Sequence, residues 1–423
     1  MQTWAGLREG EGCKLQPVEE SAAGSRARLG VIALTVLIDL IGFGIVIPIL
    51  PGYAVRFGAH GFEFGALLGV YSLMQFFASA LFGRLSDRIG RRPVLLSTML
   101  LNAGGYLLFA FAGSYRMLFL SRVIAGFAGG NISAAQAYVA DSTSPAERSR
   151  GMGMIGAAFG IGFVIGPALG GLAAHYIGPA APGLVAAGLS LANFVSAWTI
   201  LPESLRAEHR SERRGLGFAA IARGLADPTL RPLMLLWGIF PFAFAGYTAA
   251  LPLHALALFG WHDKELGLFF AVFGLTGALV QGVLFGRLAR RFGERLLVIA
   301  GTAGVAIAIG AVPFAHSSLL LYGWTVVLAL SQGLVSPGAS GLVSVYASPS
   351  EQGTTLGAAQ ALGAFGRCLG PFAIGKSYDA LGARAAFLAA AGVMIIVWLV
   401  TLGLARTDAE ALRRRVDGET SSA

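Results

Sequence analysis

Three charged side chains occur inside stretches that are otherwise apolar, where a charge is costly. Asp39 lies midway along one such stretch, Arg122 lies a few residues into another, and Arg367 lies deep in a third. Burial favours the neutral form of a carboxyl group, so Asp39 can take up and release a proton, whereas an arginine stays charged. These residue types predict chemistry based on the binding of protons and anions.

Each of these residues has a functional and a structural interpretation. Asp39 is predicted to carry a proton, and Arg122 to couple that proton to conformation by lying near a carboxylate or away from it. Arg367 is predicted to face a central cavity, toward an anionic substrate group or Asp39. Three structural alternatives stay open. Asp39 ties helices together, Arg122 snorkels to the membrane surface, or Arg367 binds carbonyl groups freed at Pro371.

Amide side chains inside the apolar stretches are candidates for lining a substrate cavity. Single amides also hold neighbouring helices together, so each one alone is a weak signal. With Arg367, the predicted lining consists of Gln75, Gln136, Gln281, Gln332 and Gln360, and Asn131 belongs to the same class. Aromatic residues such as Tyr71 are interpreted first as packing residues.

The composition of the chain is typical of a membrane protein. Charged side chains inside its apolar stretches are therefore costly. Hydrophobic residues make up 55% of the chain and charged residues 13%, with a mean hydropathy of +0.70. Soluble domains carry about 25% charged residues. A helix needs about 20 apolar residues to cross a bilayer. The resulting all-α prediction has twelve spans near 30–50, 63–83, 94–113, 117–140, 151–174, 182–201, 231–253, 264–285, 295–314, 318–340, 352–374 and 383–404.

Two internal matches indicate that the chain is doubled. The basic segment Gly83 to Pro93 recurs in weaker form as Gly286 to Arg295, at an offset of 286 minus 83, or 203 residues. The segment Gly162 to Pro167 recurs as Gly366 to Pro371, at an offset of 204. Two separate elements that share nearly one offset predict two homologous six-helix bundles, a pattern typical of transporters built from parallel repeats.

The predicted organisation follows from these matches and from one charged segment in mid-chain. We predict a tail at 1–29, a first bundle at 30–201, a linker at 202–230, a second bundle at 231–404 and a tail at 405–423.

The distribution of basic residues predicts the orientation in the membrane. One side holds Arg84 to Arg92, Arg148, Arg150, Arg206 to Arg231, Arg287 to Arg295 and Arg406 to Arg415. The other side holds only Arg56, Arg116, Lys264, Lys376 and Arg384. By the positive-inside rule both termini are expected in the cytoplasm. The net charge of +9 is then explained by the lipid headgroups, so no nucleic-acid partner is expected.

The basic segment is also predicted to form a cytoplasmic gate. Its candidate residues are Gly83, Asp87, Arg88, Gly90, Arg91 and Arg92. A carboxylate near a helix N-terminus is stabilised by the helix dipole, so Asp87 is predicted to latch onto the start of the eleventh span, around 352–355. The second copy has Arg290 at the position that corresponds to Asp87, so only the first half is expected to carry this latch.

Small residues recur about every four positions along the fifth span. The set consists of Gly156, Gly160, Gly162, Gly166, Pro167, Gly170 and Gly171. Such a face allows close helix packing and, in its functional interpretation, seals one end of a pathway.

These motifs together resemble the major facilitator superfamily, and within it the twelve-span drug:proton antiporters and their tetracycline efflux proteins. The resemblance extends from about Val31 to Ala405. It implies two six-helix bundles, alternating access and a central cavity, and the fifth-span signature implies export. The acidic and histidine residues typical of tetracycline exporters are replaced here by Gly105, Val305 and Gly277, although Gln281 agrees.

The expected function is therefore proton-coupled antiport that exports a small amphipathic compound, drug-like or tetracycline-like, across a bacterial inner membrane. The alternative is a proton-coupled symporter that imports a sugar or another small metabolite. No enzyme motif is found, and the two cysteines, Cys13 and Cys368, are too far apart in sequence for a metal-ligand pattern. The protein is expected to act as a monomer, driven by the proton gradient without a cofactor.

Overall fold

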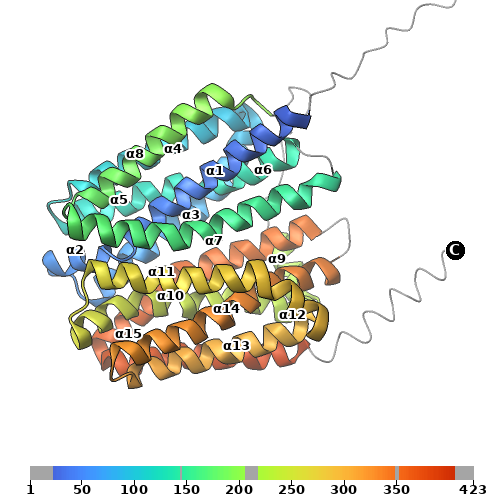
Figure 1. Cartoon of the computed structure of the whole chain (residues 1–423). Coiled ribbons are helices and arrows are strands. Elements are labelled where there is room, and N and C mark those ends of the chain that lie inside the picture. The colour runs from blue at the N-terminus through green and yellow to red at the C-terminus, as the bar shows by residue number, and fades with distance from the viewer. Residues whose placement is uncertain (1–21, 143–144, 205–217, 348–351, 405–423) are drawn as a thin grey trace, which may run out of the picture.

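The computed structural model describes residues 22–142, 145–204, 218–347 and 352–404, and its regular secondary structure in these ranges is helical. Figure 1 shows the arrangement. The first half contains α1 (Ala22–Val46), α2 (Leu50–Arg56), α3 (Gly61–Ile89), α4 (Arg91–Ala110), α5 (Tyr115–Ala128), α6 (Ile132–Ser142), α7 (Pro145–Tyr176) and α8 (Ala181–Ile200). The second contains α9 (Phe218–Ala226), α10 (Arg231–Phe259), α11 (Asp263–Leu279), α12 (Phe285–Phe292), α13 (Glu294–Ala311), α14 (Ser318–Tyr346) and α15 (Gln352–Leu402).

Among the described residues, nine helices are long and apolar enough to span a membrane. A tenth is added if α1 and α2, which meet at a bend of 40°, form one span. Two predicted spans, 352–374 and 383–404, both lie in α15, whose backbone leaves helical geometry at Gly382. The predicted span 151–174 lies in α7, which is not among the nine. The prediction of an all-helical, multi-pass membrane protein is confirmed, while the count of twelve stays a prediction.

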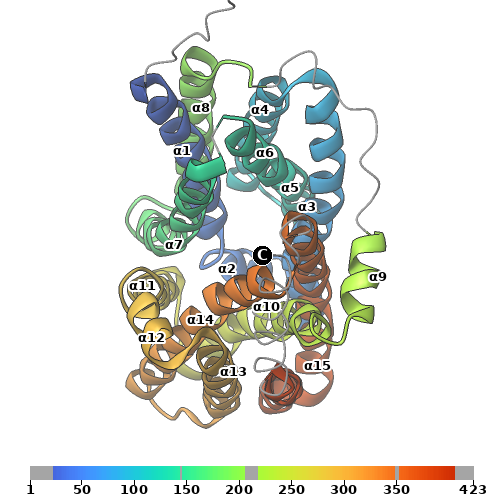
Figure 2. The same cartoon turned by 90° about the vertical axis from the view of Figure 1, so that its right-hand side faces the viewer.

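The helices gather into two bundles, one from α1 to α8 and one from α10 to α15 (Figures 1 and 2). Each bundle has its own buried apolar cluster, made of residues between Val31 and Leu201 in the first and between Leu233 and Leu404 in the second. We call the end of the molecule where α1 begins and α15 ends the terminal end. The opposite end, where α3 and α11 begin, is the distal end. The predicted limits of the bundles stay predictions.

The segment between the bundles differs from the plain charged linker that we expected. Residues 218–226 of the predicted linker form the helix α9, which packs against α10 and α15. Figure 2 shows α9 on the outside of the second bundle, near its terminal end. Its sequence explains the helix, because Phe218, Ile221 and Leu225 recur at helical spacing and give it one apolar face.

The basic segment at 83–93 is the junction of two helices. The α3 helix continues to Ile89 and α4 begins at Arg91, with only Gly90 between them at φ 109°. The second copy has the same form, since Gly293 at φ 80° separates α12 from α13. Glycine adopts positive φ without steric cost, so one residue suffices for the turn. The offset of 293 minus 90 is again 203 residues.

Within the first bundle, α7 packs on α1 through its glycines. A Cβ atom added at Gly166 would lie 2.7 Å from the carbonyl oxygen of Ile41, and one added at Gly162 would lie 2.6 Å from Leu40 Cβ. At Gly170 it would overlap the carbonyl oxygen of Ile45. The glycines therefore fix how closely the two backbones approach. Gly156 and Gly160 also lie in α7, but their packing is outside the described part of the chain.

Replacing one of these glycines by alanine is expected to destabilise the bundle. We expect Gly170→Ala to lower the free energy of unfolding by about 1–3 kcal/mol, and with it the melting temperature of the purified protein, because overpacking forces the backbones apart. Thermal unfolding followed by size-exclusion chromatography in detergent measures this change. The matched control is Gly188→Ala in α8, where a Cβ meets nothing within 4 Å and alanine should be neutral or stabilising. Equal stability of the two variants would contradict the packing argument.

The two bundles meet through small residues toward the distal end. Gly171 of α7 lies against Gly267 of α11, where a Cβ would be 2.9 Å from the Gly267 Cα. Gly65 of α3 lies against the backbone of Pro371 in α15. Figure 2 shows both helix pairs side by side, α7 with α11 and α3 with α15. Toward the terminal end the bundles diverge in Figure 1. The contacts thus close the distal end of the molecule.

Candidate functional site

A carboxylate at the centre of the first bundle is held by two amides. The side chain of Asp39 comes from α1, and its Oδ1 accepts a hydrogen bond of 3.1 Å from Asn102 Nδ2 of α4. Its Oδ2 accepts one of 2.5 Å from Asn131 Nδ2. Asn102 and Asn131 are themselves buried. Three separate elements of the bundle therefore converge on one ionisable group.

The position of Asn131 depends on a local break in the helix that follows α5. The residues Gly129–Asn131 form a single 3-10 turn between α5 and α6. Gly126 and Gly130 allow α3 to pack against this turn, since a Cβ at Gly130 would lie 2.5 Å from Ala78 Cβ. The Gln75 side chain of α3 donates to the Gly129 carbonyl at 3.2 Å and bridges the same contact. The turn thereby aims the Asn131 amide at Asp39.

The two amides suit both protonation states of Asp39. An ionised carboxylate accepts from both, as seen here, and Asn102 Oδ1 is buried without a hydrogen-bond partner. The two ends of an amide are exchanged by a rotation of 180°, which turns a donor into an acceptor. After such a rotation, Asn102 Oδ1 can accept the proton of a neutral Asp39. The site can therefore hold the carboxyl group with or without a proton.

An unpaired arginine lies in the same bundle. Arg122 of α5 is only 2% exposed, and its Nε and Nη2 atoms have no hydrogen-bond partner. Its guanidinium carbon lies 5.7 Å from the ring centre of Tyr71 and 5.5 Å from that of Phe109. Among the described residues no carboxylate lies within ion-pair distance of it. In the described part of the chain the cation lies against these two aromatic rings, and its Nε and Nη2 donors are available to an anion.

Tyr71 connects this arginine to the second bundle. The electrostatic neighbours of the Tyr71 hydroxyl are Arg122, Asp39 and Arg367. Arg367 comes from α15, is partly buried, and lies near Gly363 of the same helix. The structure therefore brings together the three charged residues singled out from the sequence, around one tyrosine and from both bundles. We call Asp39, Tyr71, Arg122 and Arg367 the central cluster.

The amides predicted to line a cavity do not converge in the same way. Gln75 and Gln332 are partly buried, and Gln136, Gln281 and Gln360 are exposed. Among the described residues no hydrogen bond joins any two of these five glutamines. Their role as cavity lining stays a prediction.

The gate residues form a network within the first bundle. Arg91 makes an ion pair with Asp87 at 2.5 Å and one with Asp141 at 3.0 Å, and it donates to Ser86 Oγ at 2.6 Å. The backbone N–H groups of Arg91 and Arg92 donate to Glu203. Gly83 and Arg88 lie in the last turns of α3. In this conformation Asp87 is bound to its own bundle, and its predicted latch onto 352–355 stays a prediction.

Two residues of the site were not selected from the sequence. Asn102 was overlooked although it is an amide inside a predicted span, the signal by which Asn131 was found. Tyr106 is an electrostatic neighbour of Arg122, and its hydroxyl fills the space above Gly42 of α1. A tyrosine in an apolar stretch gives no signal of its own, because aromatic residues are common packing residues there.

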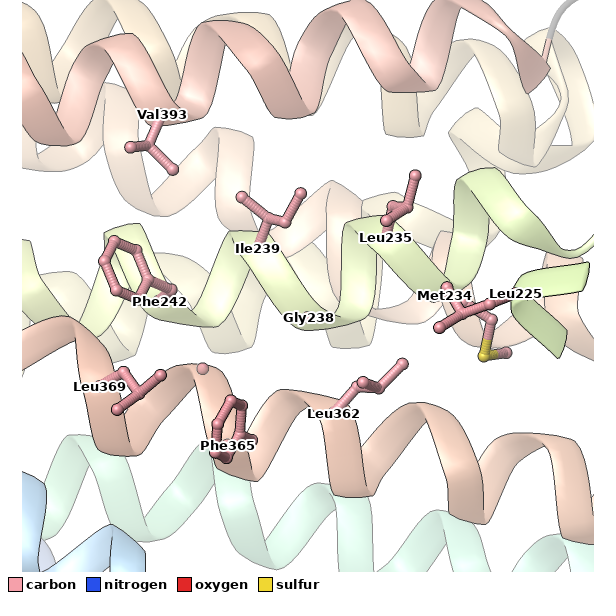
Figure 3. A pocket seen from close by; sticks show the side chains of 11 residues that line it. Leu225, Met234, Leu235, Gly238, Ile239, Phe242, Leu362, Phe365, Leu369 and Val393 are labelled. Carbon is pink, nitrogen blue, oxygen red and sulfur yellow. The ribbon is translucent and has the colours of Figure 1, made fainter. Parts of the chain in front are cut away.

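An apolar cavity of about 400 Å³ lies elsewhere, between α9, α10 and α15. Figure 3 shows α10, which carries Ile239 and Phe242, between the segment of α15 that carries Leu362 and Leu369 and the segment that carries Val393. It contains none of the residues predicted to bind protons or anions.

Comparisons with known proteins agree with this architecture. The family model described as Major Facilitator Superfamily matches residues 32–284 and 238–421. The chain is 33% identical over 401 residues to the tetracycline resistance protein, class C, of Escherichia coli, covering 92% of this chain and 97% of that protein. It is 31% identical over 439 residues to major facilitator superfamily domain-containing protein 10 of Bos taurus, covering 90% and 93%.

A solved structure is similar as well. The human organic anion transporter MFSD10 superposes with a TM-score of 0.69 at 28% identity, covering 89% of this chain and 99% of that one. The helical bundles, the repeated junction and these matches lead to one conclusion, that the chain belongs to the major facilitator superfamily and has tetracycline resistance proteins among its relatives.

Proposed function

We propose that this membrane transporter exports a small amphipathic compound in exchange for protons. The proposal rests mainly on the surroundings of Asp39. Two amides donate to its carboxylate, and one of them can accept from the carboxyl group once it is protonated. Asp39 can then bind and release a proton reversibly, as suits a carrier. Tetracycline resistance proteins among the relatives support an export function.

The expected orientation places the terminal end in the cytoplasm. The arginines of the α3–α4 junction lie at that end, and the distal end carries few basic residues, which agrees with the positive-inside rule. Because the distal end is closed here, we expect the central cluster to be reached from the cytoplasmic side. When the distal end opens and the terminal end closes, the substrate is released outside and a proton is carried inward.

The central cluster favours a substrate with a negatively charged group. Arg122 and Arg367 supply two cations, and the Nε and Nη2 donors of Arg122 are unused. A buried cation without a partner is costly, and an incoming carboxylate or sulfonate would satisfy its donors. The relative named as a human organic anion transporter supports this substrate class. Tetracycline itself is not favoured, because Gly105, Val305 and Gly277 replace the residues expected for it.

Flux in everted membrane vesicles tests this function. We expect vesicles with an acidic lumen to accumulate a fluorescent dye that bears a carboxylate, and a protonophore to abolish the accumulation. Tetracycline and a lipophilic cation serve as comparison probes and are expected to accumulate less. Vesicles from cells that lack the protein give the background. Uptake that requires an acidic exterior would support the alternative, import by proton symport. Absence of gradient-driven flux for every probe would contradict the proposal.

A further inference from the structure

The helices α3 and α15 carry the same short sequence pattern at opposite ends of the molecule. The pattern is Gly-Arg-Leu-Ser-Asp-Arg-Ile-Gly at 83–90 and Gly-Lys-Ser-Tyr-Asp-Ala-Leu-Gly at 375–382. The offset of 375 minus 83, or 292 residues, differs from the 203 to 204 residues of the doubling, so the doubling does not explain it. In both copies the final glycine has a positive φ, 109° and 81°. Each aspartate therefore lies three residues before the glycine at which a helical segment ends.

The aspartate of the second copy connects the two bundles. Asp379 of α15 accepts hydrogen bonds from the backbone N–H groups of Gly61, at 2.7 Å, and Phe62, at 2.6 Å, in the first turn of α3. These N–H groups have no partner within their own helix. The positive end of the helix dipole adds to the attraction, and bonds to a charged acceptor are strong. A carboxylate of the second bundle thus caps a helix of the first.

The glycines of this contact are required for its geometry. A Cβ at Gly61 would lie 2.6 Å from Asp379 Oδ1 and 2.7 Å from the carbonyl oxygen of Gly375. The backbones of α3 and α15 therefore approach too closely for any other residue at position 61. The cap exists only while the distal ends of the bundles are in contact.

The two helices run in opposite directions, which makes the arrangement reciprocal. The α3 helix begins at the distal end and brings Asp87 to the terminal end, where α15 begins. The first segment of α15 begins at the terminal end and brings Asp379 to the distal end, where α3 begins. Each helix thus carries an aspartate at the end of the molecule where the other helix begins. Here Asp379 is engaged, while Asp87 is paired with Arg91 in its own bundle.

We propose that Asp379 is the outer latch of the transport cycle, and that it alternates with Asp87 as the inner one. Asp379 caps α3 and holds the distal end closed, and Asp87 caps α15 when the terminal end closes. Rocking of the bundles separates one end as it joins the other, so the two caps are never formed together. The inference rests on the alternating access assumed in the proposed function, and it assigns a role to a residue outside the central cluster.

Distances between spin labels measure the two ends directly. Cys13→Ser and Cys368→Ala provide a background without native cysteines. Labels on Ile177→Cys and Leu319→Cys report the distal end, and labels on Ile200→Cys and Leu296→Cys report the terminal end, because all four side chains are exposed. We expect Asp379→Ala to raise the ratio of distal-open to distal-closed molecules by about tenfold, as loss of bonds to a charged acceptor predicts. The terminal-end distances should shorten in the same molecules.

Two further variants separate a latch from a merely structural contact. Glu63→Gln is the matched control, because Glu63 caps the same helix from within its own bundle by accepting from His60 N, and it should leave the ratio unchanged. Adding Asp87→Ala to Asp379→Ala should return the ratio toward that of the parent protein, since both latches are then lost. Unchanged distances in Asp379→Ala would overturn the proposal. Distance distributions that broaden at both ends without a change in their mean would overturn it as well.

The distances are measured without substrate or proton gradient. Failure of the latch therefore leaves the export proposal standing, and failure to detect export leaves the distance result interpretable.

Discussion

Vesicles that contain Asp39→Asn are expected to show no proton-driven accumulation of the anionic dye, at a normal level of inserted protein. An asparagine cannot ionise, so it cannot carry a proton across the cycle. The fold should survive, because the free Oδ1 of Asn102 can accept from the new amide after a rotation of the Asn102 side chain. Dye uptake under an inside-acid gradient measures the effect, and chromatography in detergent measures folding.

The control for this variant is Asp227→Asn, an exposed aspartate just after α9 whose carboxylate accepts a hydrogen bond from Thr229 N. It should transport at the parental rate. Gradient-driven transport by Asp39→Asn would show that the proton is carried elsewhere and that Asp39 merely ties α1 to its neighbours. Loss of folded protein in Asp39→Asn would likewise favour the structural role.

The second large effect is expected for Arg122→Gln, which should abolish uptake of the anionic dye without lowering stability. Burial of an unpaired charge costs several kcal/mol even after relaxation. Each cation–π contact, with Tyr71 and with Phe109, stabilises the arginine by only about 0.5–2 kcal/mol. The net contribution of the Arg122 charge to folding is therefore close to zero or unfavourable, so a neutral side chain should leave the melting temperature unchanged or raised. Transport should fall to background because the donors that bind the anion are gone.

Arg116→Gln is the matched control, since it makes the same change on the same helix at an exposed position. It should leave both dye uptake and melting temperature unchanged. A marked loss of stability in Arg122→Gln would indicate that the arginine holds the bundle together, and retained dye uptake would exclude it from the anion site.

Much of the fold was predictable because membrane insertion depends on local composition. An apolar run of about 20 residues spans a bilayer whatever its neighbours are, so hydropathy located most helices. The doubling was equally visible, because Gly90 and Gly293 repeat a turn that only glycine forms without strain. The helix α9 was missed because nine amphipathic residues within a charged segment carry no span signal.

The candidate site was predictable only in part. Asp39 and Arg122 were found because an ionised group in an apolar stretch is conspicuous by itself. Their partners were not predicted, since Asp39 is bound by two amides and Arg122 lies against aromatic rings. Hydropathy does not give the rotation of a helix about its axis, and this rotation decides which side chains face each other.

The sequence by itself determined that this protein spans a membrane, that its halves are related, and which ionisable groups lie within apolar stretches. Each of these properties depends on composition or repetition along the chain. Only the tertiary structure decided which groups form hydrogen bonds with each other. Asn102 and Asn131 donate to Asp39, and the N-terminus of α3 donates to Asp379, which lies 318 residues from Gly61. Such contacts depend on how rigid helices are rotated and paired in space, which is set by glycine-mediated packing between segments far apart in sequence.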